Sequence, residues 1–399
     1  MKTKYEVIWI DDEWEKMDAF KEECEVIHQI YLRPFSTQKA GMDEFDKNPK
    51  KWDAIILDAK LEKDGVGVTG LREAVTHINQ VSLSHKIPYF ISTGQPDLMG
   101  NETFEQAFGK YYIKERDDQK LIEDIKLAAG KSSRFQTKTF YLDAIEQLQS
   151  FDDAWCCEKI LDILETMHFP EKNIDPLLYY NPLRQTLEYI FRKASKAGII
   201  PDEFIGKEKD DVNLNQCVQF LSGGNADWIG IRFGGAKESV VPVHIKNMMF
   251  QILNLGNINS HSRTLDDDEQ KRLGAYFKEN VCNTRYLIYS LALQICEIAV
   301  FMGKYIDTHK DNSENKKQFK TFGTVEPIEG NDSICVIKSK RPGRESCICI
   351  SAKYASGKNL IGKKVVILEE SQNTNPSTKE AYPYFAAKIQ SLEKENGSK

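Results

Sequence analysis

The sequence lacks a run of eighteen or more purely apolar residues, so it predicts no transmembrane helix. Its first residues, MKTKYEVIWIDDE, end in two aspartates and a glutamate before an apolar stretch of signal-peptide length can form. The most apolar segment, 286–306, is interrupted by polar residues and by Glu297. We interpret this segment as a helix buried in a bundle or at the interface of a homodimer. We therefore expect a cytoplasmic protein with no membrane partner.

The sequence also lacks the cysteine patterns of metal sites and disulfide frameworks. Its nine cysteines are an odd number, and none of them forms a C-x-x-C motif. They are predicted to be small buried hydrophobic residues in a reducing compartment. The net charge of −6, from 54 basic and 60 acidic residues, argues against a surface devoted to binding polyanions. No helix-turn-helix pattern is present, so readout of duplex DNA is not expected.

The chain has 399 residues, enough for two to four domains, and its pattern changes three times. Residues 1–130 alternate strands with amphipathic helices, which predicts an α/β fold with a doubly wound parallel sheet of five strands. Residues 131–306 have helical spacing and predict an all-α domain, with a Gly-rich loop or short hairpin at 222–240. Residues 307–320 are polar and predict a flexible linker. Residues 321–392 contain five short β runs, which predict a small antiparallel β-barrel. The five strands expected in the first segment are 6–10, 31–34, 54–58, 89–92 and 111–113.

Charged and hydroxyl side chains follow the predicted strands of the first segment. Asp11 and Asp12 come directly after EVIWI, and Asp58 ends AIILD. Thr93 and Lys114 directly follow the next two strands. Because the carboxyl ends of parallel strands meet at one edge of the sheet, these groups are expected to lie together. Three carboxylates at one edge repel one another unless a cation neutralises them, and oxygen ligands of this kind suit Mg²⁺.

These residues carry a resemblance to the receiver domain of two-component response regulators. The matching motifs are IDDE (10–13), ILD (56–58), ST-G (92–94) and IK (113–114). The intervals from 12 to 58, 58 to 93 and 93 to 114 are 46, 35 and 21 residues, as the family requires. The resemblance covers about the first 130 residues, a flavodoxin-like fold.

The resemblance implies a role for each matched position. Asp58 would be the phosphoacceptor, and Asp11, Asp12 and Asp58 would hold Mg²⁺ together with the backbone carbonyl of Lys60. Thr93 would be the switch hydroxyl, Lys114 the lysine that pairs with the phosphoryl group, and Tyr111 the aromatic residue that moves on activation. A histidine kinase or phosphotransfer protein would be the donor. No enzymatic activity is expected beyond this self-catalysed phosphoryl transfer.

The sequence departs from the family at two places. Glu115 stands where the family usually has a proline, and AKLEKDGVG (59–67) replaces the usual Met-Pro after the phosphoacceptor. Neither change removes a chemical group. The alternative interpretation is a pseudo-receiver, a scaffold that binds a partner without being phosphorylated.

The helical segment resembles HEPN domains weakly, through LRQTLEYIFRKA and LGNINSH (255–261). HEPN ribonucleases place an arginine four to six residues before a histidine on one helix. His261 has no arginine between 249 and 260, so Asn257 and His261 are interpreted as a structural relic and nuclease activity is not expected. A receiver-gated ribonuclease is the alternative function.

The C-terminal segment resembles OB barrels of the cold-shock kind, through GTVE (323–326), SICVI and a closing AAKI (386–389). That family stacks single-stranded bases on aromatic residues of its second and third strands, and those residues are absent here. A basic loop, KSKRPGR, offers Lys338, Lys340, Arg341 and Arg344 as contacts for the backbone of single-stranded RNA or DNA. The output partner is therefore expected to be a protein or a single strand.

Overall fold

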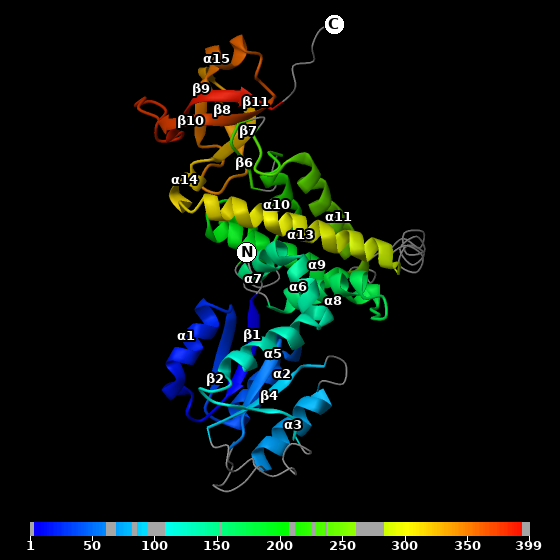
Figure 1. Cartoon of the computed structure of the whole chain (residues 1–399). Coiled ribbons are helices and arrows are strands. Elements are labelled where there is room, and N and C mark those ends of the chain that lie inside the picture. Colours follow the sequence, from blue (N-terminus) through cyan, green and yellow to red (C-terminus); the bar gives the residue numbers. More distant parts are fainter. Residues whose placement is uncertain are drawn as a thin grey trace. The chain divides into compact units, whose positions relative to one another are not determined.

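A computed structural model describes residues 4–60, 69–81, 86–94, 108–151, 154–206, 212–224, 229–235, 238–260 and 283–392 (Figure 1). The chain forms two compact units. The first is Met1–Ile145 with Leu161–Ile174, and the second is Glu146–Ile160 with Asp175–Lys399. The boundaries predicted at 130, 306 and 320 follow sequence pattern, whereas these units follow contacts between residues. Each unit is described by itself.

The first unit is built on a parallel sheet of five strands in the order β2-β1-β3-β4-β5. The strands are β1 (Tyr5–Ile10), β2 (Ile30–Phe35), β3 (Ala54–Asp58), β4 (Tyr89–Thr93) and β5 (Tyr111–Ile113). Each lies within one or two residues of its predicted range, including the short YLRP segment. The doubly wound parallel fold predicted for this part of the chain is confirmed.

The two faces of this sheet are covered by different helices. Strand residues alternate between faces, so Ile8 and Ile10 pack on one side and Val7 and Trp9 on the other. The first face is covered by α2 (Gln38–Lys47) and α3 (Thr69–Val81), and the second by α1 (Asp18–Val26) and α5 (Asp118–Gly130) (Figure 1). Burying one such aliphatic or aromatic side chain contributes roughly 1.5–3 kcal/mol to stability. The alternation of side chains along each strand determines which of them are buried on which face.

The first unit continues past residue 130 into α6 (Ser133–Phe140). Ser132 begins this helix, because its hydroxyl accepts a hydrogen bond from the backbone N–H of Phe135. The ring of Phe135 stacks on Tyr5 of β1 with the centroids 4.6 Å apart. Arg134, which is only 1% exposed, pairs with Asp162 at 2.8 Å. These contacts join α6 to the sheet and to residue 162 of α8 (Ala154–His168).

The second unit begins with helices, as predicted. The helical elements of its described part are α7 (Leu142–Ser150), η4 (Pro176–Leu178), α9 (Tyr180–Lys196), η5 (Asp202–Phe204), α10 (Leu214–Leu221), α11 (Val243–Ser260) and α13 (Arg285–Thr308). The first four residues of α7 (142–145) belong to the first unit. Helices α9, α11 and α13 pack against one another. The helical character predicted for residues 131–306 is confirmed, and the segment also contains one short strand, Ile231–Phe233.

Helix α13 is long and apolar enough to cross a membrane by length and composition. Half of its most apolar 18-residue window is buried inside the protein, through side chains that include Ile288, Leu291, Ile295 and Met302. A core helix of a bundle has the same composition, because its apolar residues face other helices. The burial supports the interpretation of this segment as a bundle helix.

The segment 307–320, expected to be a flexible linker, is ordered by polar contacts. It contains the end of α13, the short helix α14 (Asn312–Lys316) and the start of β7. The side-chain amides of Asn312 and Asn315 donate to the carbonyls of Lys196 and Ala197, at 2.9 and 2.7 Å. The polar composition of the segment indicated a flexible linker. Its asparagine side chains instead donate hydrogen bonds to carbonyl groups at the end of α9, which have no partner within the helix.

The C-terminal part is the predicted five-stranded barrel. Its strands are β7 (Phe319–Ile328), β8 (Asn331–Ser339), β9 (Ile348–Ser351), β10 (Lys364–Gln372) and β11 (Tyr384–Ser391). The order is β7-β8-β9-β11-β10, and β10 pairs with β7 to close the barrel. The barrel is not wholly antiparallel, because β9 and β11 pair in parallel. A helix, α15 (Ala352–Gly357), lies between β9 and β10.

Two details concern strand β7, at which the barrel closes. Gly323 lies where β7 is paired on both sides, and a Cβ atom there would come within 2.2 Å of the carbonyl oxygen of Lys338. Glycine is therefore required at this close approach of two strands. The Gly-rich segment 222–240, predicted as a loop or hairpin, supplies one strand, β6 (Ile231–Phe233), which pairs with the beginning of β7.

Candidate functional site

The residues predicted from strand ends do meet at the carboxyl edge of the parallel sheet. Asp11 follows β1, Asp58 ends β3, Thr93 ends β4 and Lys114 follows β5. Asp11, Asp58 and Thr93 are all buried, at 0%, 5% and 2% exposure. The parallel arrangement brings them together, because every strand leaves the sheet at the same edge.

Lys114 is the centre of this cluster. Its ammonium lies 2.8 Å from Oδ2 of Asp11 and 2.9 Å from Oδ1 of Asp58. The remaining carboxylate oxygens accept backbone hydrogen bonds, Oδ1 of Asp11 from the N–H of Glu13 and Oδ2 of Asp58 from the N–H of Lys60. One ammonium therefore serves two buried carboxylates, and the three groups together carry a net charge of about −1.

The protonation of these groups follows from their burial and their charges. Burial raises the pKa of Asp58, and the nearby carboxylate of Asp11 raises it further, while the charge of Lys114 and its hydrogen bond lower it in part. Burial alone would lower the pKa of Lys114, but its hydrogen bonds and charge interactions with Asp11 and Asp58 outweigh burial and raise it. Lys114 therefore stays positively charged and offsets part of the negative charge of Asp11 and Asp58.

Asp12 lies outside this cluster, because its side chain is exposed after the end of β1. Within the described ranges, no three His, Cys, Asp or Glu side chains are gathered closely enough to hold a metal ion. The donor chemistry nevertheless fits Mg²⁺ in part, since Asp11 and Asp58 already share one cation and carboxylate oxygens are the ligands that Mg²⁺ prefers. The roles of Asp12 and of the Lys60 carbonyl as ligands stay predictions.

Tyr111 begins β5 and is partly buried against the core that lies under α2 and α3. Thr93 pairs with Ile113 in the register of β4 and β5, and its carbonyl accepts a hydrogen bond from the backbone N–H of Lys114. Thr93 and Lys114 therefore lie at the ends of neighbouring strands. Their roles in activation stay predictions.

The loop after Lys114 differs from the family for a reason visible in the backbone. Glu115 has a φ of +66°, in the left-handed region. Proline holds φ near −65°, so it cannot take this conformation. The backbone N–H of Glu115 also donates to Asp118 at 3.1 Å, a bond that proline would remove. The other departure, AKLEKDGVG, falls mostly at 61–67 and lies outside the described residues.

The basic loop of the barrel is placed between β8 and β9, but most of its charges have partners within the barrel. Lys338 pairs with Glu326 at 2.6 Å, and Arg344 pairs with Glu370 at 3.0 Å. Arg344 also stacks on the ring of Tyr384, 3.8 Å from its centroid. These partners are distant in sequence, so no sequence pattern could have shown them.

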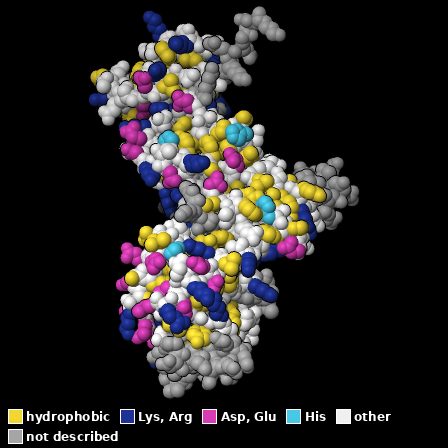
Figure 2. Space-filling view, viewed as in Figure 1, with side chains coloured by type: hydrophobic (Ala, Val, Ile, Leu, Met, Phe, Trp, Pro, Cys, Tyr) yellow, Lys and Arg dark blue, Asp and Glu magenta, His cyan; other side chains and the backbone are white. Residues whose placement is uncertain are grey.

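The other two cations of this loop differ from each other. Arg341 is partly buried and donates to the hydroxyl of Thr321 at 2.7 Å, and burial lowers its pKa. Lys340 is exposed, and no ion pair joins it to a described residue. On the face shown in Figure 2, Lys and Arg side chains of the barrel lie among acidic ones. The loop therefore presents fewer free positive charges than its sequence indicates.

The structure does not test the pair Asn257 and His261, which the sequence predicts to be a structural relic. His261 and the side chain of Asn257 lie outside the described residues. Neither the described helices nor the comparisons with known proteins support the HEPN resemblance.

Solved structures similar to this chain are receiver domains. A response regulator receiver domain protein from Clostridium thermocellum is 24% identical over 32% of this chain and 95% of that chain, with a TM-score of 0.26. A response regulator receiver protein from Burkholderia phymatum is 18% identical over 32% and 96% of the two chains, with a TM-score of 0.25. A CheY-like receiver domain protein from Methanospirillum hungatei is 21% identical over 32% and 95%, with a TM-score of 0.26. No family model and no curated protein matches the sequence. The N-terminal third of the chain thus resembles the receiver domains of response regulators.

Proposed function

We propose that this protein is a phosphorylation-switched response regulator of a two-component phosphorelay. In this proposal Asp58 accepts a phosphoryl group from a histidine kinase or a phosphotransfer protein. The observation that supports it best is the ammonium of Lys114, which touches Asp58 and Asp11 together at the carboxyl edge of the sheet. The strand end of Thr93 lies beside Ile113, directly before this lysine.

The chemistry follows from these positions. An oxygen of Asp58 forms a bond to the phosphorus of phosphohistidine, the P–N bond breaks, and the imidazole nitrogen leaves and takes up a proton. The ammonium of Lys114 offsets the charge of the transferred group, and the Thr93 hydroxyl donates a hydrogen bond to one of its oxygens. Asp11, Asp12, Asp58 and the carbonyl of Lys60 would hold Mg²⁺. The ion supplies further positive charge to the phosphoryl oxygens.

Phosphoryl uptake tests the assignment of Asp58 directly. The full chain is incubated with acetyl phosphate and Mg²⁺, and the mass of the intact protein is measured. We expect one acid-labile phosphoryl group per chain, absent in Asp58→Asn. The matched control is Asp43→Asn, an exposed aspartate of α2, which should be phosphorylated like the unchanged protein. A phosphoryl group that persists on the Asp58→Asn variant would overturn the assignment.

Metal binding tests a separate part of the proposal. An octahedral ion that keeps several of its waters gains little from two or three carboxylates, so Mg²⁺ should bind weakly. Asp12→Ala should weaken that binding and slow phosphorylation, measured by calorimetry and by the rate of phosphoryl uptake. An unchanged Mg²⁺ affinity in this variant would remove Asp12 from the site.

The output of the switch is proposed to run through the helical segment and the barrel to a protein or a single-stranded nucleic acid. The proposal includes no catalytic activity beyond phosphoryl transfer to Asp58. The alternative function is a pseudo-receiver scaffold that binds a partner without being phosphorylated. It replaces the proposed function if the unchanged protein takes up no phosphoryl group from acetyl phosphate or from a phosphorylated kinase.

A further inference from the structure

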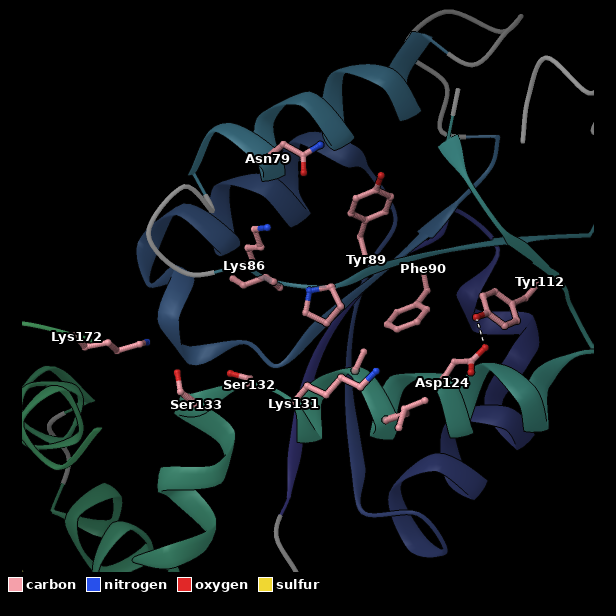
Figure 3. Close-up of a pocket in the computed structure, with 14 residues that line it drawn as sticks. Asn79, Lys86, Tyr89, Phe90, Tyr112, Asp124, Lys131, Ser132, Ser133 and Lys172 are labelled. Atoms are coloured by element: carbon pink, nitrogen blue, oxygen red, sulfur yellow. Dashed lines mark hydrogen bonds between the residues drawn. The ribbon is translucent and has the colours of Figure 1, made fainter. Parts of the chain in front are cut away.

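A cavity of about 950 Å³ opens at the edge of the parallel sheet where β4 begins, beside Tyr89 (Figure 3). It is lined by the start of β4, the end of α5 and the beginning of α6, all within the first unit. Tyr89 at the cavity begins β4 and Thr93 at the phosphoacceptor edge ends it, so about 13 Å of strand separates the two sites. Its volume falls within the range of small-molecule sites.

The first feature of this cavity is an unpaired stretch of strand. β5 is short and pairs only with Ile91–Thr93, so no strand among the described residues lies beside the beginning of β4 on that side. The carbonyl of Thr93 faces β5, where it accepts from Lys114, and alternation places the N–H and C=O of Tyr89 on the same side. No backbone group in the described ranges bonds to them. A donor and an acceptor are therefore available to a planar group that can bond with both.

The second feature is a pair of lysine side chains that form no ion pair with a described carboxylate. Lys86 and Lys131 line the cavity and are exposed, and no carboxylate of a described residue pairs with either. The carboxylate of Asp124 is already engaged, since it accepts from Tyr112 at 2.6 Å and pairs with Lys110. The third lining lysine, Lys172, pairs with Glu165 at 2.6 Å. Two free ammonium groups thus remain to attract an anion.

The third feature is an apolar wall. Phe90 of β4 packs in the same core as α5. Pro88, Leu127 and Ala128 also line the cavity, and Leu127 is 60% exposed. An exposed leucine beside a cavity loses unfavourable contact with water when a flat ligand covers it. Figure 3 shows the side chain of Lys131 extending from the end of α5 toward this wall.

We propose that this cavity binds a small heterocyclic anion of the nucleotide class. The ring of the ligand bonds to the backbone of Tyr89 and packs against Leu127 and Pro88, while its phosphate groups contact Lys86 and Lys131. A nucleotide combines the three properties that the cavity matches: paired donor and acceptor atoms, a flat ring and negative charge. The site is separate from Asp58 and gives the receiver unit a second input.

The test is a titration of the full chain with the fluorescent probe mant-ADP, followed by anisotropy. Buffer with EDTA and without Mg²⁺ keeps metal-bound nucleotide away from the acidic edge. We expect saturable binding that ADP, GDP, CDP or UDP reverses, with adenosine and inorganic phosphate each weaker by about tenfold or more, because each supplies only part of the contacts.

Variants locate the site. Lys86→Gln with Lys131→Gln should weaken binding about tenfold or more. The matched control is Lys39→Gln with Lys47→Gln, two lysines of α2 that do not line the cavity, and it should bind within about twofold of the unchanged protein. Absence of saturable binding up to about 1 mM, or equal binding by the Lys86/Lys131 variant, would overturn the proposal.

Discussion

The ammonium of Lys114 lies 2.9 Å from the carboxylate of Asp58, although the two residues are on strands that are not neighbours in the sheet. The same ammonium reaches Asp11 at the end of a third strand, on the other side of Asp58. A single cation therefore holds together the ends of β1, β3 and β5.

Lys114→Met should destabilise the protein. The change leaves the buried carboxylates of Asp11 and Asp58 without their shared cation, which costs about 3 kcal/mol for a buried pair at pH 7. Urea unfolding of the full chain measures the loss, with Lys39→Met on α2 as the control for losing one exposed charge. Mg²⁺ should restore part of the stability, since it can replace the missing charge. A loss below about 0.5 kcal/mol would show that the ion pair contributes no more than an exposed one.

Asp58→Asn should stabilise the protein more at neutral than at acidic pH. Burial raises the pKa of Asp58 above its ordinary value of 3.8, so the folded state holds the proton more tightly than the unfolded state does. The contribution of this carboxyl to folding is fully present below pH 3.8 and is lost as the pH rises through the raised pKa. Asparagine has no such proton to lose. Unfolding free energies of both proteins at pH 4 and pH 7 measure the difference, and a gap independent of pH would contradict the prediction.

Replacing Glu115 by glycine should leave the stability of the protein unchanged or increase it, whereas replacing it by proline should decrease it. Glycine takes the observed φ of +66° without strain, so Glu115→Gly should be neutral or should stabilise by up to about 1 kcal/mol. Glu115→Pro forces a different φ and removes the hydrogen bond to Asp118, so it should destabilise by roughly 2 kcal/mol or more. Thermal unfolding compares the two, and Glu115→Ala separates the effect of the side chain from that of the backbone. Equal stability of the glycine and proline variants would show that this backbone conformation is not required.

Single-stranded oligonucleotides should bind the full chain weakly and with a shallow dependence on salt. Three of the four basic residues of the 338–344 loop have partners within the barrel, which leaves Lys340 to contact phosphate. One neutralised phosphate on a single strand gives a slope of log affinity against log salt near −0.7. Lys340→Ala should remove that slope, measured by anisotropy from low to moderate salt. A slope of several units, lost only when Lys338, Arg341 and Arg344 are also changed, would show that the internal pairs open for nucleic acid.

The residues at the strand ends of the first unit could be predicted from the sequence, because two simple rules determine where they lie. Side chains alternate along a strand, which identifies buried segments such as EVIWI and AIILD, and parallel strands end at one edge. Asp11, Asp58, Thr93 and Lys114 follow from these regularities without any knowledge of distant contacts. The five barrel strands were found in the same way, from short apolar runs between turns.

Other features depended on which distant residues meet, and only the tertiary structure decided them. Glu326 and Glu370 pair with basic residues of the 338–344 loop across the barrel, and no periodicity in the sequence marks such partners. Asn312 and Asn315 order a segment whose composition indicates a linker, because α9 ends beside them. The cavity at Tyr89 exists because β5 covers only the second half of β4. The sequence alone therefore determined which residues lie at the strand ends, through local alternation, whereas long-range packing decided which charges are neutralised and which edges stay open.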